Sequence, residues 1–239
     1  MKIVAIIPAR AGSTSIKNKN LIKIKNKPLI SFPIIAAKKS KLINRVIVST
    51  DSIRIKKVAL KYGAEVPFLR PKKISGFLSK DIEYLKHCIK WLKKEKYFPD
   101  LIILLRPTTP FREIRVIDDA IKLIKKNKCD SLRSVSIAKE TPFKMWKKRG
   151  KLIKPLFGMK DINKTNYPRQ KLEKFYWQNG YIDIIKPETI KRFGNELGKK
   201  ILFYEIKSNI FEIDYKYQLK FADKFLQNYK IVERNLYPS

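Results

Sequence analysis

A group of cations and small residues follows the first apolar segment of this chain. The apolar segment, Lys2–Ile7, reads as a buried parallel strand, and the sequence IPARAGSTSIKNKN covers residues 7–20. Side chains that attract phosphate lie in it and just beyond it, namely Arg10, Lys17, Lys19 and Lys23, together with the small residues Gly12 and Ser13. Ligands of α/β sheets bind at the carboxyl ends of strands, so this loop predicts a site for a polyanion such as a nucleoside triphosphate. Neither GxxxxGK[ST] nor GxGxxG is present, so the segment is not a Walker loop or a dinucleotide fingerprint.

Polar residues also follow the other predicted strands. They are Ser49, Thr50 and Asp51 after residues 45–49, Arg70 after residues 65–69, Arg106, Thr108, Thr109 and Arg112 after residues 101–105, and Glu212 with Asp214 in a late extended segment. An alternative role for Asp51 is to cap the helix that follows it. The shared position of these residues predicts that they converge at one edge of a sheet.

Glu212 and Asp214 form the one pair of acids that suits a divalent cation. They lie two residues apart in an extended segment, so both side chains are expected on the same face. Magnesium prefers a few protein carboxylates supplemented by substrate phosphates and water. The alternative is a surface ion pair with neighbouring lysines.

Strands and helices alternate along the part of the chain that must position these residues. The expected strands cover residues 2–7, 45–49, 65–69, 101–105, 131–137, 180–185, 201–205 and 211–213, and the expected helices cover residues 28–39, 52–62, 81–96, 113–126 and 217–229. Short apolar strands separated by helices predict a parallel sheet that is covered on both faces. We therefore expect an α/β fold of the Rossmann-like type, with a mostly parallel sheet.

The rhythm changes between residues 142 and 178, where aromatic, proline and basic residues replace the alternating pattern. This composition favours a hairpin and loops that project as an arm from a single domain of residues 1–239. Exposed aromatic residues in such an arm indicate a partner surface, most simply a second copy of the chain.

The bulk composition narrows the class of protein. The chain has 239 residues, 44% of them hydrophobic, and no apolar run approaches the roughly 18 residues of a membrane span. We therefore expect a cytoplasmic protein without a membrane partner. Its net charge of +34 comes from lysines spread over the polar faces of the predicted helices, and no known nucleic-acid-binding motif is present. Nucleic acid is thus an unlikely main partner, although the field should attract small polyanions.

The cysteines and the single histidine contribute no recognisable site. Cys88 and Cys129 lack the spacing of a metal site or a disulfide framework, which favours two buried apolar residues. His87 lies near the apolar face of a predicted helix, so a structural role is favoured over a catalytic one.

Six segments together resemble the acylneuraminate cytidylyltransferase family, also called CMP-sialic acid synthetases. The segments are IPARAGSTSIKNKNL, VIVSTDS, AEVPFLRP, LLRPTTPFR, PRQ…YWQNGYIDI and EID…FAD, and they occur in order from the first strand to the last helix. The VPFLRP and RPTTPFR forms look closest to the branch that acts on legionaminate and related nonulosonates. The resemblance implies a nucleotidyltransferase-type fold, CTP, Mg²⁺, an acidic nine-carbon 2-keto sugar as acceptor, and a homodimer with interacting arms.

The resemblance also implies roles for individual residues. Nucleotide binding is carried over to Arg10, Ser13, Lys19, Asn20, Arg70, Ser79 and Asp81, sugar binding to Arg106, Thr109, Arg169, Gln170, Asn179 and Asp183, and metal binding to Glu212 and Asp214. Catalysis would then rest on Arg10 and Lys19, which stabilise the leaving pyrophosphate, and on Asp214, which with Glu212 holds the Mg²⁺ that polarises the α-phosphate attacked by the sugar hydroxyl. No general base is assigned; Asp51 and a metal-bound hydroxide are the alternatives.

Four positions depart from the family pattern. Thr14 stands where relatives carry a lysine, which makes Lys17 the candidate replacement, and Phe77 stands where a polar residue is expected. Glu212 replaces the first aspartate of an Asp-Ile-Asp segment. Arg106 replaces a glutamine of the sialic-acid-specific members, so we expect a sugar other than N-acetylneuraminate.

Two alternatives to a CMP-nonulosonate synthetase remain. One is a cytidylyltransferase for a different keto acid, such as the eight-carbon Kdo. The other is a basic protein that keeps the fold and binds nucleic acid. Turnover with a panel of keto-acid sugars separates these possibilities.

Overall fold

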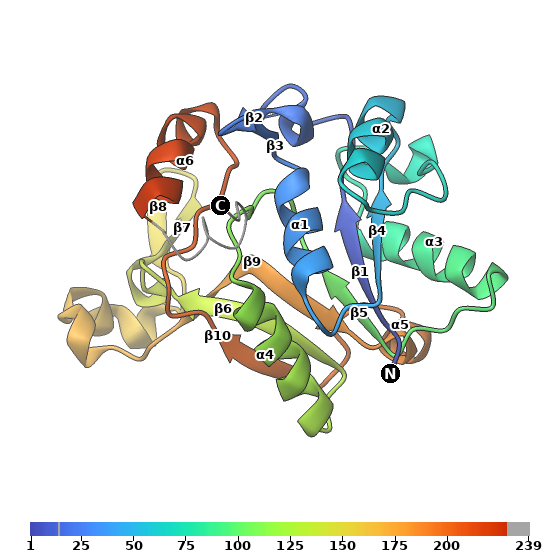
Figure 1. Cartoon of the computed structure of the whole chain (residues 1–239). Coiled ribbons are helices and arrows are strands. Elements are labelled where there is room, and N and C mark those ends of the chain that lie inside the picture. The colour runs from blue at the N-terminus through green and yellow to red at the C-terminus, as the bar shows by residue number, and fades with distance from the viewer. Residues whose placement is uncertain (14, 229–239) are drawn as a thin grey trace.

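A mixed six-stranded sheet forms the centre of the computed structural model, which describes residues 1–13 and 15–228 (Figure 1). The strand order is β10-β6-β9-β5-β1-β4. The strands are β1 (Ile3–Pro8), β4 (Arg45–Ser49), β5 (Leu101–Leu104), β6 (Ser131–Ile137), β9 (Tyr176–Ile185) and β10 (Ile201–Glu205). All neighbouring pairs are parallel except those of β9, which runs antiparallel to both β5 and β6. The prediction of a mostly parallel sheet is confirmed.

Helices cover both faces of this sheet, as the sequence predicts. They are α1 (Ser31–Lys39), α2 (Ile53–Lys61), α3 (Asp81–Lys94), α4 (Ile114–Lys126), α5 (Pro187–Phe193) and α6 (Lys216–Asn228). Alternation along β1 sends Ala5 and Ile7 toward the face covered by α1, α2 and α4, while Val4 and Ile6 pack with α3 and α5. None of these helices, within the described ranges, is long and apolar enough to cross a membrane.

Two of the expected strands are wrong. Of residues 65–69, Glu65 alone makes a bridge, to Ile47, and residues 211–213 form no strand. Short apolar runs occur in loops as well as in strands, and here Ile213 is buried against α6 and Phe111 rather than in a sheet. The expected strand at 180–185 begins earlier, at Tyr176, and the last helix begins at Lys216, while its expected end at Tyr229 lies outside the described residues. Elements that were not expected are α5 and the small pair β2 (Lys23–Ile24) and β3 (Lys27–Pro28).

Residues 142–175 form a separate excursion before β9, at one side of the main sheet (Figure 1). It contains the hairpin β7 (Trp146–Arg149) and β8 (Leu152–Pro155) and the 3₁₀ helices η3 (Pro142–Lys144), η4 (Met159–Asn166) and η5 (Arg169–Lys171). Phe143, Phe157 and Phe175 pack together inside it, with ring centroids 5.0–5.7 Å apart. The hairpin and loops expected here are thus present.

A third apolar cluster fixes the segment that carries the two predicted metal ligands. Ile213 is fully buried among Phe111, Ala222 and Leu226, and its backbone N–H donates to the carbonyl oxygen of Thr108 at 2.8 Å. Its neighbours on either side, Glu212 and Asp214, are only half-buried. Burial of one apolar side chain therefore holds two carboxylates beside the loop that follows β5.

Strand β9 approaches two loops closely at Gly180. This residue has φ +61°, and an added Cβ would lie 3.3 Å from Thr109 Oγ1 and 3.6 Å from Glu212 Oε1. Gly194, at the end of α5, has a similar φ of +71° but nothing within 4 Å of its Cβ position. The two glycines therefore share a backbone conformation and differ in their surroundings.

We expect Gly180→Ala to lower the free energy of unfolding by about 2–3 kcal/mol, because left-handed strain and contact with two side chains add together. Gly194→Ala should cost only the strain, about 1 kcal/mol. Chemical denaturation of both variants measures the difference. Equal losses would show that β9 does not press on Thr109 and Glu212.

Candidate functional site

The loop after β1 is shaped by contacts with two other segments. The backbone N–H of Ala11 donates to Asp51 Oδ1 at 2.7 Å, and Asn20 Nδ2 donates to the Arg10 carbonyl oxygen at 3.0 Å. Asp51 is therefore not the cap of α2, because Ser52 has that role and accepts from the N–H of Ile55. Its carboxylate instead connects the loop after β1 to the end of β4.

Arg10 reaches the segment that the sequence assigns to the nucleotide. Its Nη1 donates to the carbonyl oxygen of Gly76, which also accepts from the backbone N–H of Ser79, and its guanidinium lies 5.9 Å from the centre of the Phe77 ring. Ser13 is half-buried and Lys17 is exposed. Thr14 lies outside the described residues.

Lys19 connects the loop to the pair of acids. It is buried in the 3₁₀ helix η1 (Lys19–Leu21), and its Nζ lies 3.2 Å from Asp214 Oδ1. The alternative of a surface ion pair thus holds only in part, since Asp214 does pair with a lysine but with one that is withdrawn from solvent. Cation and carboxylate face each other here across 195 residues of sequence.

The electrostatics of Glu212 suit a bound cation. Burial, and then the neighbouring charge of Asp214, raise the pKa of the Glu212 carboxyl above its usual value, and Arg106 offsets this in part. Two carboxylates that repel each other in a half-buried position gain from a hard cation between them. No group of three or more His, Cys, Asp or Glu residues suited to a metal occurs in residues 1–13 and 15–228, so a cation would need further oxygen ligands from outside the protein.

Thr109 adds an unsatisfied polar atom to the same place. The residue is 1% exposed, and its Oγ1 has no hydrogen-bond partner in the described part of the chain. The atom faces the open side of Gly180, next to Glu212. Buried hydroxyls nearly always have a partner, so this atom is an exception among the described residues.

The side chain of Arg70 makes its hydrogen bonds within the protein. It is buried, its Nε donates to Ser49 Oγ at 3.0 Å, and its Nη2 donates to the Ser49 carbonyl oxygen at 2.6 Å. Its guanidinium also lies 4.6 Å from the centre of the Tyr84 ring, and burial lowers its pKa. The structure therefore shows Arg70 holding the end of β4 against α3.

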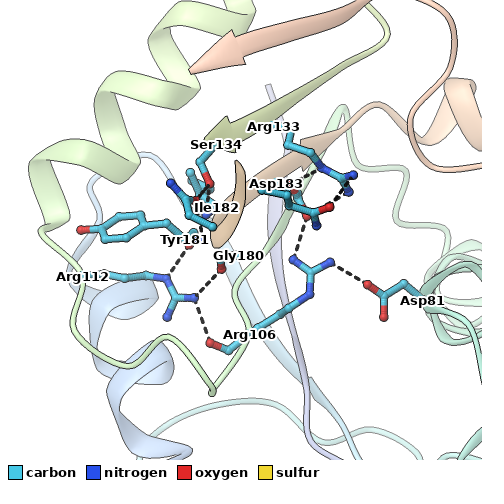
Figure 2. A network of polar contacts seen from close by, with 11 residues as sticks. Asp81, Arg106, Arg112, Arg133, Ser134, Gly180, Tyr181, Ile182 and Asp183 are labelled. Atoms are coloured by element: carbon cyan, nitrogen blue, oxygen red, sulfur yellow. Dashed lines mark hydrogen bonds and ion pairs between the residues drawn. The ribbon is translucent and has the colours of Figure 1, made fainter. Parts of the chain in front are cut away.

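Four charged side chains form a second cluster around Arg106, at the start of the loop after β5 (Figure 2). Arg106 donates to Asp183 Oδ2 at 2.7 Å and to Asp81 Oδ2 at 2.6 Å. Arg133 contacts both oxygens of Asp183, at 3.0 and 3.4 Å. Burial alone lowers the pKa of Arg106, but the carboxylates of Asp183 and Asp81 outweigh it and raise that pKa. The two arginines and two aspartates balance each other in charge.

The remaining predicted sugar contacts are not all at this place. The amide of Asn179 is buried and joins β9 to β6, since its Oδ1 accepts from Ser134 Oγ at 2.6 Å and its Nδ2 donates to Ser136 Oγ at 2.9 Å. Arg169 and Gln170 are exposed on the excursion, where Arg169 donates to the carbonyl oxygen of Ala138. No hydrogen bond or ion pair of the described residues joins these two to the charged clusters.

Sequence reasoning assigned no role to Arg112 and overlooked Arg133. Arg112 is fully buried beside the loop after β5, and Arg133 lies in the middle of β6. A charged residue inside the predicted strand SLRSVSI was the available signal for Arg133.

The histidine and one cysteine have the structural roles that the sequence predicts. His87 packs edge-on against Phe68, with ring centroids 4.6 Å apart. Cys88 is buried, and burial raises the pKa of its thiol to about 12. Cys129 is only half-buried, contrary to expectation.

A cleft of about 400 Å³ lies elsewhere, before β6 and β10, and is lined by Lys128, Cys129, Asp130, Lys186, Arg192, Phe193, Lys199 and Lys200. None of the predicted site residues lines it. It opens at the amino ends of the two strands, whereas ligands of such sheets bind at the carboxyl ends. The clusters around Lys19 and Arg106 are therefore the better candidate.

Comparison with known proteins agrees with this geometry. Residues 4–234 match the sequence profile of a family described as Cytidylyltransferase. Post-translational flagellin modification protein B of Campylobacter coli is 32% identical over 98% of this chain and 97% of its own length. CMP-N,N'-diacetyllegionaminic acid synthase of Legionella pneumophila is 33% identical over 95% of this chain and 97% of its own length.

A solved structure of CMP:2-keto-3-deoxy-manno-octonic acid synthetase, complexed with CTP, has the same fold. It superposes with a TM-score of 0.71 over 95% of this chain and 99% of that one, at 15% identity. The profile match spans nearly the whole chain, and two relatives exceed 30% identity over almost their full lengths. This chain therefore belongs to the cytidylyltransferase family.

Proposed function

We propose that this enzyme uses CTP to activate an acidic nine-carbon 2-keto sugar of the legionaminic or sialic type, forming the CMP-sugar and pyrophosphate. The observation that carries the proposal is the meeting of Lys19 with Asp214, because it sets phosphate-binding cations opposite a pair of carboxylates. The relatives from Legionella and Campylobacter that are named CMP-N,N'-diacetyllegionaminic acid synthases support the choice of sugar. We place the reaction in the cytoplasm, where CTP is available.

The chemistry is an in-line displacement at phosphorus. The anomeric hydroxyl of the sugar attacks the α-phosphorus of CTP, the bond to the bridging oxygen breaks, and pyrophosphate leaves with that electron pair while the hydroxyl proton passes to solvent or a base. Arg10 and Lys19 would neutralise the charge that grows on the leaving group. Their positions on one short loop supply orientation, which is the larger part of such catalysis. Ser13 and Asn20 belong to the same loop and would help to cradle the phosphates.

Glu212 and Asp214 would hold Mg²⁺. Their oxygens are hard ligands, and burial together with the neighbouring charge of Asp214 raises the pKa of the Glu212 carboxyl, which supports the proposal. When bound, Mg²⁺ would draw electron density from the phosphate that is attacked. Asp214 also keeps Lys19 in place, so it serves both the metal and the cation of the loop.

The nucleotide and the sugar would lie on opposite sides of the loop after β5. Ser79 would flank the nucleotide side, where Arg70 holds the end of β4, and Asp81 would lie between the two sides, because it accepts from Arg106. The free Oγ1 of Thr109 and the cluster of Arg106 and Asp183 would face the sugar. Asn179 would act there through the geometry of β9, since its amide is already bonded to two serines.

A homodimer would complete the sugar side. Arg169 and Gln170 lie on the excursion of residues 142–175, and large apolar side chains are exposed there, including Trp146, Leu152, Ile153, Phe157 and Met159. Such a surface is characteristic of a protein contact. We propose that each excursion packs against a second copy of the chain and brings Arg169 and Gln170 to the partner's site.

Pyrophosphate release measured with CTP, Mg²⁺ and a panel of sugars tests the function. We expect N,N'-diacetyllegionaminate to give kcat/KM at least about tenfold higher than Kdo, because a sugar that leaves built polar groups unpaired loses at least that much. A higher kcat/KM for Kdo would show that the enzyme is a cytidylyltransferase for an eight-carbon keto acid instead. No turnover with any sugar, combined with tight and salt-sensitive binding of nucleic acid, would overturn the proposal.

The metal assignment predicts that Asp214→Asn lowers kcat by roughly a hundredfold or more and weakens binding of Mn²⁺ in the presence of a non-hydrolysable CTP analogue. The substitution keeps the size of the side chain, so packing around Ile213 is preserved. Asp119→Asn, which changes an acid on the outer face of α4, is the matched control and should leave both quantities unchanged. Near-normal turnover of Asp214→Asn at saturating Mg²⁺ would exclude Asp214 as a ligand.

The charged cluster predicts that Arg106→Gln changes sugar preference. The substitution removes the contacts to Asp81 and Asp183, and we expect the ratio of kcat/KM for legionaminate over N-acetylneuraminate to fall by roughly tenfold. Arg133→Gln also removes an ion pair from Asp183 but leaves Arg106 in place, so it controls for the lost pair. An unchanged ratio in Arg106→Gln would show that Arg106 does not select the sugar.

A further inference from the structure

Arg112 is a buried cation that bonds only to backbone. Its side chain is fully buried just before α4, and none of the ion pairs formed within the described residues includes it. Nε donates to the carbonyl oxygen of Tyr181 at 2.6 Å, and Nη2 donates to those of Arg106 at 2.8 Å and Gly180 at 3.3 Å (Figure 2). Nη1 donates to the carbonyl oxygen of Thr109.

These carbonyl groups belong to two segments that lie just beyond the end of the β5–β9 ladder, whose last pair is Leu104 and Asp183. Arg106 and Thr109 lie in the loop after β5, whereas Gly180 and Tyr181 lie in β9 at the point where the pairing with β6 shifts register. Buried carbonyl groups need donors, and here one guanidinium supplies them for both segments. The hydroxyl of Tyr181 accepts from the N–H of Glu113 at 2.6 Å and so fixes the chain next to Arg112.

The two segments carry the groups that would face the sugar. Thr109 and Arg106 are on the loop, and Asn179 and Asp183 are on β9. A shift of about 1 Å between groups that orient a substrate can reduce the rate by roughly a hundredfold. By contrast, Arg10 and Lys19 belong to the loop after β1, which Arg112 does not touch.

We propose that Arg112 is a positioning residue for the acceptor sugar, because it holds the loop after β5 and the middle of β9 as one unit. The proposal rests on the proposed function for the identity of the ligand. A positioning role and a purely structural role differ in which ligand they affect. A structural role would weaken the nucleotide and the sugar alike, whereas a positioning role affects the sugar first.

The test is Arg112→Lys, which keeps the charge and loses the fork of donors. We expect KM for the sugar to rise roughly tenfold or more while KM for CTP stays within about twofold of the wild type. Arg115→Lys, at a position whose side chain is 91% exposed one turn away, should change neither. Hydrogen exchange gives a readout without turnover, and we expect faster exchange in residues 106–113 and 176–183 but not in residues 10–21.

Tyr181→Phe provides a second variant in case Arg112→Lys does not fold. It removes the acceptor of the Glu113 N–H without altering the buried charge, and it should show the same selective effect at smaller size. An unchanged sugar KM, a parallel rise of both KM values, or exchange that quickens throughout the chain would overturn the proposal. Absence of wild-type turnover with every sugar would instead overturn the proposed function, and the exchange pattern would still decide whether Arg112 holds the two segments together.

Discussion

The arrangement of this site depends on a guanidinium that has been taken out of water without a carboxylate beside it. Burying a lone charge is costly, and burial lowers the pKa of Arg112 to about 9, yet the carbonyl groups of the loop after β5 and of β9 would be unsatisfied without it. The buried guanidinium therefore needs these carbonyl groups as acceptors, and the carbonyl groups need the guanidinium as a donor. The segment of Glu212 and Asp214 has a separate anchor, because Ile213 is buried among Phe111, Ala222 and Leu226 and its N–H donates to the carbonyl oxygen of Thr108.

Charge is used in two ways in this enzyme. The net charge of +34 comes largely from exposed lysines, and it acts at long range as a field that draws anions and weakens with salt. Two cations inside the site form ion pairs instead, Lys19 with Asp214 and Arg106 with Asp81 and Asp183. Pairing holds these side chains in fixed directions before a substrate arrives, so they need little reorganisation when it does.

Local pattern predicted most of the scaffold and the convergence of several polar residues. Apolar runs indicated the strands at the centre of the sheet, and the polar residues at their ends predicted that the loop of Arg10 and Lys19 lies near Asp214, as the contact of Lys19 shows. The direction of β9 could not be predicted, because an apolar run reads the same for parallel and antiparallel neighbours. The contacts of Arg112 with Tyr181 and of the Asn179 amide with Ser134 and Ser136 join residues 43 to 69 apart in sequence, which no local pattern encodes. The expected strand at 211–213 failed because Ile213 is buried by a helix and a loop instead of a sheet.

The direction of strand β9 determines where its first residues lie. Because it runs against its neighbours, its first residues, Tyr176 to Gly180, lie at the carboxyl edge of the sheet, and the excursion of residues 142–175 leads straight into them. Between the exposed apolar hairpin and this strand lie only η4, η5 and short loops. A protein contact made by the excursion would therefore lie directly before, in sequence, the strand that carries Asn179 and Asp183.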